Sequence, residues 1–208
     1  MEILIVDDHN VVRQGLKQII QEEYSSASFG EAGTGNEALE KMRNKNWDIV
    51  ILDITMPGKS GLEILKQIKL ETIKTAVLVL SMHSEDQYAI RILKAGAAGY
   101  LTKESASTEL ITAIKTILGG RKYINTSLAE KLANNLEIDT NKPIHELISD
   151  RELQVLCLIA SGKTVSEVAT ELCLSVATIS TYRARILEKM NMRTNAELTH
   201  YAIREGLV

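Results

Sequence analysis

The segment Ile3-Leu4-Ile5-Val6-Asp7-Asp8 decides the fold, because a short hydrophobic run ends abruptly in two carboxylates. The same arrangement returns in Ile49-Val50-Ile51-Leu52-Asp53. Short runs of β-branched residues and leucines are typical of strands buried on both faces of a parallel sheet. Because the carboxyl ends of such strands meet at one edge of the sheet, the pattern predicts that the three aspartates lie together there.

Further hydrophobic runs, and the segments between them, extend this pattern. Ala76–Leu80 is a third strong run, and Ser28–Ala32 and Gly99–Leu101 are shorter candidates. The intervening segments carry apolar residues at the spacing of an amphipathic helix, as over residues 12–20 and 110–118. Alternating strands and helices predict an α/β domain, here a five-stranded parallel sheet of the flavodoxin-like type with five helices.

Two more polar residues follow predicted strands, Ser81 and Lys103. Three clustered carboxylates repel one another unless a cation joins them or one of them is protonated. Their oxygen atoms favour Mg²⁺, with Mn²⁺ as a substitute, over zinc. The lysine and the hydroxyl add donors for an anion, and an anion beside a hard cation is typical of phosphoryl transfer.

Four motifs at these strand ends resemble the receiver domain of two-component response regulators, over residues 1–121. The resemblance implies that Asp53 accepts phosphate from the phosphohistidine of a sensor histidine kinase. It also implies that Mg²⁺ is held by Asp7, Asp8, Asp53 and the Thr55 carbonyl, and that Lys103 pairs with the phosphoryl oxygens. The motifs are Val6-Asp7-Asp8-His9, Leu52-Asp53-Ile54-Thr55-Met56-Pro57-Gly58, Leu80-Ser81 and Leu101-Thr102-Lys103.

The resemblance further implies a switch at Ser81 and Tyr100. The Ser81 hydroxyl would move toward the phosphoryl group, and Tyr100 would then turn inward. Structural alternatives remain for single residues: Asp8 and Ser81 each suit the N-cap of a following helix, and Tyr100 suits a half-buried strand position.

Length and composition favour two domains. The chain has 208 residues, of which 45% are hydrophobic and 25% charged, as in ordinary globular proteins. It shows neither a signal peptide nor a hydrophobic run long enough to span a bilayer, so we expect a cytoplasmic protein without a membrane partner. Cys157 and Cys173 lack metal-ligand spacing, which fits a reducing compartment.

Residues 122–143 are mostly polar and are predicted to link the two domains. Within them, Ser127–Leu136 has leucines at helical spacing and predicts a short helix.

The last segment, residues 144–208, predicts an all-α domain of four helices. Ser149 and Glu152 have the spacing of a capping box at the start of the first helix, and Gly162 ends that helix. The tight turn Cys173–Ser175 separates the second helix from the third, which is the spacing of a helix-turn-helix. Residues 176–193 hold four cationic side chains, Arg183, Arg185, Lys189 and Arg193, against Glu188 alone, which favours contact with DNA phosphates.

This region is similar to the LuxR-type DNA-binding domain, so the chain resembles a NarL/FixJ-type response regulator, and most closely the GacA/UvrY branch. By family position, Ser180, Thr181 and Ala184 would face bases, whereas Thr178, Arg183, Arg185 and Lys189 would mostly contact phosphate. The sequence departs from the family at Cys173, where glycine is frequent, and at Ser180 and Ala184, where lysine is common. The resemblance rests on Ile148–Leu156, Glu167–Ala169, Leu174–Ser175 and Thr178–Ile179.

The combined prediction is a transcription factor whose dimerisation and DNA binding are promoted by phosphorylation of Asp53. Its partners would be a sensor histidine kinase, double-stranded promoter DNA and a second copy of itself, with RNA polymerase as a further candidate. It would be no enzyme beyond its own phosphotransfer and dephosphorylation. Two alternatives stay open: a magnesium-dependent aspartyl phosphatase or phosphotransferase, and an adaptor whose last four helices bind protein.

Overall fold

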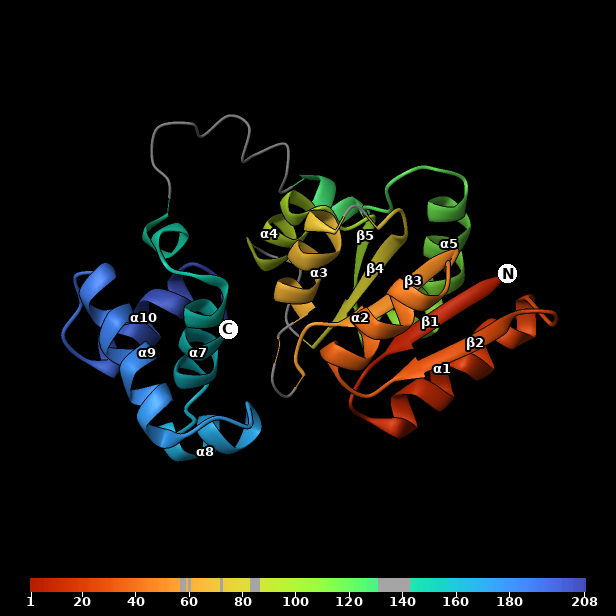
Figure 1. Ribbon diagram of the computed structural model, residues 1–208. Helices are drawn as coiled ribbons and strands as arrows, with labels where there is room; N and C mark the ends of the chain where they lie inside the picture. The colour runs from red at the N-terminus through yellow and green to blue at the C-terminus, as the bar shows by residue number, and fades with distance from the viewer. Residues whose placement is uncertain (57–58, 60, 72, 83–86, 131–142) are drawn as a thin grey trace. The chain divides into compact units, whose positions relative to one another are not determined.

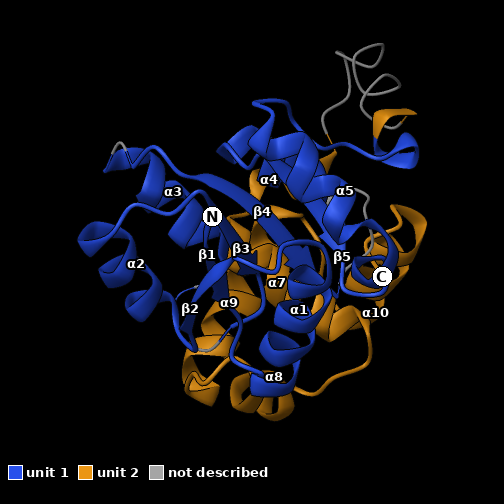
Figure 2. Ribbon diagram, turned by 90° about the vertical axis from the view of Figure 1, so that its right-hand side faces the viewer, with its two compact units in different colours: residues 1–128 blue, residues 129–208 orange. Residues whose placement is uncertain are grey.

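The structure, a computed structural model, describes residues 1–56, 59, 61–71, 73–82, 87–130 and 143–208. It contains two compact units, Met1–Leu128 and Ala129–Val208, which Figure 2 colours separately. Pro57 and Gly58 of the second motif, and residues 131–136 of the predicted linker helix, lie outside the described residues.

The first unit is built on a five-stranded parallel sheet, as predicted (Figure 1). The spatial order β2-β1-β3-β4-β5 is that of flavodoxin-like folds, in which all strands are parallel and the strand order reverses between β1 and β3. Strands β4 and β5 each run one residue beyond the predicted hydrophobic segment. The strands are β1 (Glu2–Val6), β2 (Ser28–Ala32), β3 (Ile49–Asp53), β4 (Ala76–Ser81) and β5 (Gly99–Thr102).

Helices cover both faces of this sheet. Alternate strand residues such as Ile3, Ile51 and Leu78 pack with apolar residues of α1 and α5 into one core. Helices α2, α3 and α4 lie on the other face (Figure 1). Burial on both faces explains why the central strands are almost uninterrupted runs of aliphatic residues. The helices are α1 (Asn10–Glu23), α2 (Gly35–Asn44), α3 (Gly61–Leu70), α4 (Gln87–Ala95) and α5 (Ala106–Leu118).

The first residues of the predicted linker pack with the first unit. The Tyr123 N–H donates to the Ala98 carbonyl at 2.8 Å, which extends the edge of β5. Leu128 is fully buried, and residues 126–130 are helical. The chain therefore leaves the first unit later than its polar composition indicates.

Residues 143–208 of the second unit form a short 3-10 helix and four α-helices, η1 (Ile144–Leu147), α7 (Asp150–Ala160), α8 (Val165–Glu171), α9 (Val176–Lys189) and α10 (Asn195–Arg204). The predicted capping box is present, since Ser149 and Glu152 exchange hydrogen bonds with each other's backbone N–H. Helix η1 was not predicted; His145 fixes it, because its ring Nδ1 lies 2.8 Å from the Tyr201 hydroxyl of α10.

The turn between α8 and α9 is left-handed at Cys173, whose φ is +51°. The Leu174 N–H donates back to the Ala169 carbonyl at 2.9 Å, and Ser175 then caps α9 by accepting from the Thr178 N–H at 3.0 Å. Glycine adopts positive φ without steric cost, whereas a side chain there is strained. Cys173, where the family often has glycine, is thus the residue of this turn whose backbone conformation most favours glycine.

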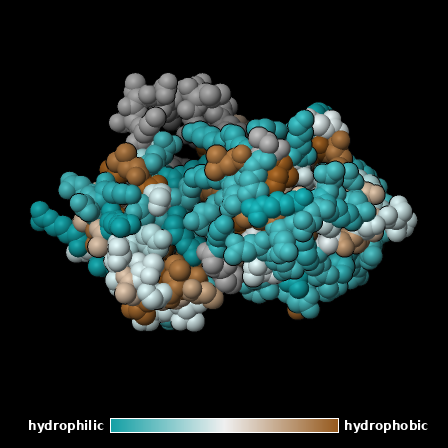
Figure 3. All heavy atoms as spheres, viewed as in Figure 1, coloured by the Kyte–Doolittle hydropathy of each residue, from teal (hydrophilic) through white to brown (hydrophobic). Residues whose placement is uncertain are grey.

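Hydrophilic residues cover most of the face shown in Figure 3, with hydrophobic side chains in separate patches. Within the described ranges, no helix combines the length and the apolar character that crossing a membrane requires.

Candidate functional site

The sheet brings two of the predicted aspartates together. Asp53 is the last residue of β3, and Asp7 directly follows β1, its neighbour in the sheet. Both are 1% exposed, although they are acidic. Gly61, the first residue of α3, lies so close to the end of β3 that a Cβ there would be 2.4 Å from the Asp53 carbonyl oxygen. Topology and close packing therefore fix the position of Asp53.

Lys103 joins the two aspartates. Its Nζ lies 2.7 Å from Asp7 Oδ2 and 2.7 Å from Asp53 Oδ2, and its side chain is only 13% exposed. The backbone places it there, because the Lys103 N–H donates to the Ser81 carbonyl at 2.8 Å, continuing the pairing of β5 with β4. One cation thus serves two buried carboxylates that are 46 residues apart in the sequence.

Burial and the neighbouring opposite charges shift the pKa values of Asp53 and Lys103 in opposite directions. Burial raises the pKa of Asp53 to about 6, against the attraction of Lys103 and with a smaller repulsion from Asp7. For Lys103, burial would lower the pKa, but Asp53 and Asp7 outweigh it, so its pKa is raised. Lys103 is therefore charged at neutral pH, whereas the carboxylates remain incompletely neutralised.

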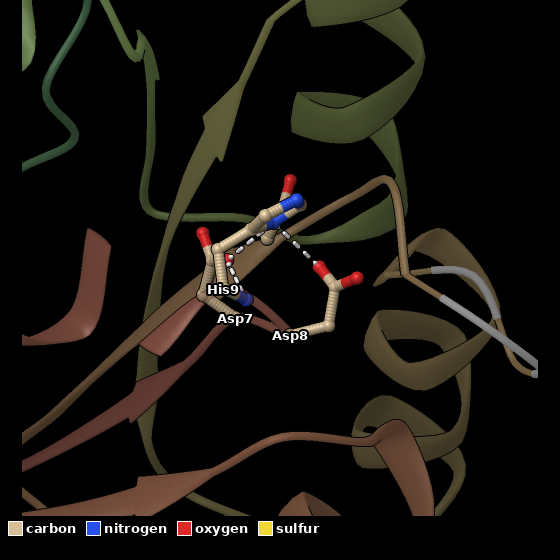
Figure 4. Close-up of side chains that lie close together, drawn as sticks. Asp7, Asp8 and His9 are labelled. Carbon is tan, nitrogen blue, oxygen red and sulfur yellow. Dashed lines mark hydrogen bonds and ion pairs between the residues drawn. The ribbon is translucent and has the colours of Figure 1, made fainter. Parts of the chain in front are cut away.

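Asp8 and His9 directly follow Asp7, and Figure 4 shows the three side chains close together. The His9 ring Nδ1 is 3.0 Å from Asp8 Oδ1 and 3.2 Å from Asp7 Oδ1, and its side chain is 66% exposed. The N-cap of α1 is His9, without a side-chain capping bond. Capping of α1, the structural alternative for Asp8, is therefore not what this side chain does.

The cluster has the donors that a hard cation needs. Ligand atoms of Asp7, Asp8, His9 and Asp53 all lie within 4.8 Å of one another. Asp8 Oδ1 is buried and accepts no hydrogen bond from the described residues, although His9 Nδ1 lies 3.0 Å away as an ion-pair partner when protonated. Thr55 closes the site from the chain after β3, where its N–H donates to Asp53 Oδ1 at 3.1 Å. An unsatisfied carboxylate oxygen beside two buried ones fits a divalent cation with oxygen ligands.

The two predicted switch residues are both fully buried. Ser81 is the last residue of β4, at the carboxyl end of that strand. Tyr100 lies within β5 opposite Val79 and is 0% exposed rather than half-buried. Ser81 lies at the same strand-end edge as Asp53 and Lys103. Tyr100 lies within β5, the strand next to that of Ser81 and three residues before Lys103.

Helix α9 holds the residues predicted to meet DNA. Ile179 and Ile186 are fully buried and Met190 nearly so, as their spacing predicts. The opposite side of the helix is exposed and includes Ser180, Thr181, Ala184 and Arg185. Thr178 is half-buried at the first turn, and its Oγ1 lies 2.8 Å from Ser175 Oγ.

The cationic side chains of α9 differ in their partners. Arg183 Nε donates to Asn195 Oδ1 at 2.6 Å. Lys189 Nζ lies 3.0 and 2.7 Å from the two carboxylate oxygens of Glu152, which is buried. Within the described part of the chain, neither a hydrogen bond nor an ion pair holds Arg185. The sequence predicts phosphate contacts for all three cations, but in the structure only Arg185 of these three has no protein partner among the described residues.

Glu152 has a second partner that its position in the sequence does not indicate, because it pairs with Lys189 as well as with Ser149. Burial would raise its pKa, but Lys189 and the Ser149 N–H outweigh this and hold the pKa below its ordinary value. Its position three residues after a serine already indicated a capping box, and that pattern gave no reason to assign a second partner 37 residues away.

A doubly wound α/β unit with buried aspartates and a lysine at its strand ends, combined with a helix-turn-helix unit, defines the class of receiver proteins with a DNA-binding output. Known families agree: residues 3–115 match the response regulator receiver domain, and residues 146–202 match the bacterial regulatory proteins of the luxR family. The chain belongs to the response regulators with a LuxR-type domain, and it is a DNA-binding member of a two-component system.

Relatives match over essentially the whole chain. The response regulator UvrY of Escherichia coli (strain K12) is 36% identical over 208 residues, covering 100% of this chain and 95% of the relative. The response regulator GacA of Pseudomonas viridiflava is 34% identical over 209 residues, covering 100% and 98%. Among solved structures, RcsB from Salmonella enterica serovar Typhimurium, bound to promoter rprA in the presence of the phosphomimetic BeF3-, is 25% identical with a TM-score of 0.65, covering 97% and 98%.

Proposed function

We propose that Asp53 is the phosphoacceptor and that it receives the phosphoryl group of a phosphohistidine on a sensor histidine kinase. The observation that carries this proposal is the Lys103 ammonium shared between the buried Asp7 and Asp53 carboxylates. Asp53 ends β3, and at the same strand-end edge Asp8 is partly exposed and His9 largely so, which favours an approach of the phosphohistidine from this edge.

The chain's own residues then perform the transfer. An ionised Asp53 oxygen attacks phosphorus, the new P–O bond forms as the P–N bond breaks, and the imidazole leaves with the electron pair. Lys103 turns from the carboxylates to a phosphoryl oxygen, which keeps it paired throughout. Asp7, Asp8, Asp53 and the Thr55 carbonyl would hold Mg²⁺, with Mn²⁺ as a substitute. When bound, this ion neutralises the carboxylates and the transferred oxygens.

The phosphoryl group acts as an electrostatic signal. The acyl phosphate carries about two negative charges where the carboxylate carried one, and it places three acceptor oxygens at the strand-end edge that includes the buried Ser81. A ligand shifts an equilibrium only if it binds one state better, so the active arrangement of Ser81 and Tyr100 already exchanges with the inactive one. We propose that this shift promotes a homodimer which binds two half-sites of promoter DNA through α9. A similar protein, RcsB, has been solved bound to promoter DNA in the presence of a phosphomimetic, which is consistent with DNA binding by the phosphorylated form.

Three further expectations belong to the same proposal. The protein catalyses only its own phosphotransfer and dephosphorylation, it works in the cytoplasm, and RNA polymerase is a candidate partner once it is bound to DNA.

Labelling with radioactive acetyl phosphate tests the acceptor. Asp53→Asn should abolish stoichiometric, magnesium-dependent labelling, because no other carboxylate among the described residues lies in the same position. Asp48→Asn is the matched control, since Asp48 is exposed just before the opposite end of β3 and should leave labelling intact. Full labelling of Asp53→Asn would refute the assignment. Multiple turnover of a free phosphate ester by the wild-type protein would favour the phosphatase alternative.

A further inference from the structure

The exposed side of α9 has an unusual content for a DNA-contacting helix. We define its base-contacting face by four exposed residues, Ala177, Ser180, Thr181 and Ala184. At about 100° per residue, Ala177, Thr181 and Ala184 point away from the buried Ile179 and Ile186. None of the four carries a charge or a long hydrogen-bonding side chain, so this face offers mainly methyl groups.

Thr181 is the largest side chain of this face, and an internal bond sets its orientation. Its Oγ1 donates to the Ala177 carbonyl at 2.9 Å, one helical turn earlier. The hydroxyl proton is thereby used inside the helix and is not offered to a base. The γ-methyl group is the part of Thr181 that remains for contact with DNA.

Two of the three long cationic side chains of α9 are held by other residues. Arg183 is bonded to Asn195 at the start of α10, and Lys189 is bonded to the buried Glu152 of α7. Bidentate recognition of guanine by arginine or lysine needs a free fork or ammonium that reaches into the major groove. Arg185, at the edge of the base-contacting face, suits a phosphate contact.

We propose that α9 selects its DNA through the 5-methyl groups of thymines in the major groove, with the Thr181 methyl as the central contact. The inference rests on the proposed function of α9 and names the base that it recognises. Apolar contact of alanine and threonine methyl groups with the thymine methyl is an established mode of readout. Ala177 to Ala184 spans about 10 Å along the helix, enough to pass about three base pairs.

The test removes the thymine methyl groups and nothing else from the bases. Full-length protein, treated with beryllofluoride and magnesium, is used to enrich binders from a random-sequence duplex library long enough for two half-sites. The enriched duplexes are then prepared with either thymine or uracil, and both affinities are measured at one salt concentration. Wild-type protein should bind the uracil form about fourfold more weakly for each thymine methyl group that the helix touches.

Two substitutions separate the Thr181 methyl from other effects of uracil on DNA. Thr181→Ser keeps the hydroxyl bond to Ala177 but lacks the methyl, and it should lower the thymine-to-uracil affinity ratio by about fourfold per half-site. Thr181→Val keeps the methyl and should preserve the ratio. Equal binding of both forms by wild-type protein, or an unchanged ratio in Thr181→Ser, overturns the inference while DNA binding itself stands. If no duplex is enriched, the proposed DNA-binding function of α9 fails, and the inference fails with it.

Discussion

The acidic cluster of the first unit and the DNA-facing helix of the second are assembled in contrasting ways. Asp7, Asp53 and Lys103 come from three separate strand ends and meet in a buried site. The residues of α9 come from one continuous helix and lie largely on its surface. In the first case the backbone topology decides which side chains meet. In the second, side-chain partners on other helices decide which residues remain accessible to DNA.

This difference makes the two sites respond differently to mutation. Removing a member of the acidic cluster leaves buried charge without a partner, so stability and chemistry change together. Removing a cation from α9 affects stability or DNA binding according to where that cation is held. Three experiments test this contrast.

The largest effect is expected from Lys103→Met. Two buried carboxylates then lose their shared cation, and the free energy of unfolding of the first unit should fall by about 3 kcal/mol at pH 8. Urea unfolding followed by tryptophan fluorescence measures this unit alone, because Trp47 is the chain's single tryptophan and is buried there. Magnesium chloride should restore part of the loss by providing another cation.

Lys115→Met is the control for this experiment, since Lys115 pairs with Glu23 at the surface and its removal should leave the transition unchanged. If Lys103→Met is as stable as the wild type and is stabilised no more than the wild type by magnesium, then Lys103 does not stabilise the buried Asp7 and Asp53 carboxylates.

An intermediate effect is expected from paired substitutions on α9. Lys189→Met should destabilise the second unit by about 1–2 kcal/mol, because the buried Glu152 carboxylate loses its cation and keeps only the Ser149 backbone as partner; the exposure of Lys189 limits the loss. Arg185→Met should leave stability unchanged but lower the slope of log affinity against log salt by about 1. Circular dichroism and DNA titrations at several salt concentrations measure the two properties. The reverse pattern, with Arg185 stabilising and Lys189 setting the salt slope, would contradict the assignment.

The smallest effect concerns the turn before α9. Cys173→Gly should stabilise the second unit by about 0.5–1 kcal/mol, because glycine relieves the left-handed strain but orders a more flexible chain. Cys173→Ala retains a Cβ and should have no such effect. If both substitutions raise the melting temperature equally, the gain comes from removing the thiol and not from the backbone.

Most of the first site could be predicted because it depends on strand order. Once Val6 and Leu52 pair near the ends of neighbouring parallel strands, the residues that follow them, Asp7 and Asp53, must lie close together, and hydrophobic runs indicate such strands clearly. The strand boundaries were predicted to within about a residue for β4 and β5 for the same reason. The full burial of Tyr100 was beyond the sequence, because tyrosine is common at half-buried strand positions too.

The second unit was less predictable where distant side chains meet. The pairing of His145 with Tyr201 joins residues 56 apart, and that of Lys189 with Glu152 joins residues 37 apart. A single sequence indicates contacts mainly through the periods of helices and strands, and neither pairing follows such a period. The turn at Cys173 was predictable because its constraint is local, set by one φ angle between two amphipathic helices.

Gly61 gives the acidic cluster a mechanical asymmetry. Because α3 backs directly onto the Asp53 carbonyl, the end of β3 has no free space on that side, and the Gly61 N–H fastens it further by donating to the Ile54 carbonyl at 3.0 Å. The backbone that carries Asp53 is therefore anchored by α3. When a group is added to the Asp53 carboxylate, we expect β3 to keep its place, so that packing around a single glycine passes the adjustment to the neighbouring side chains of the site.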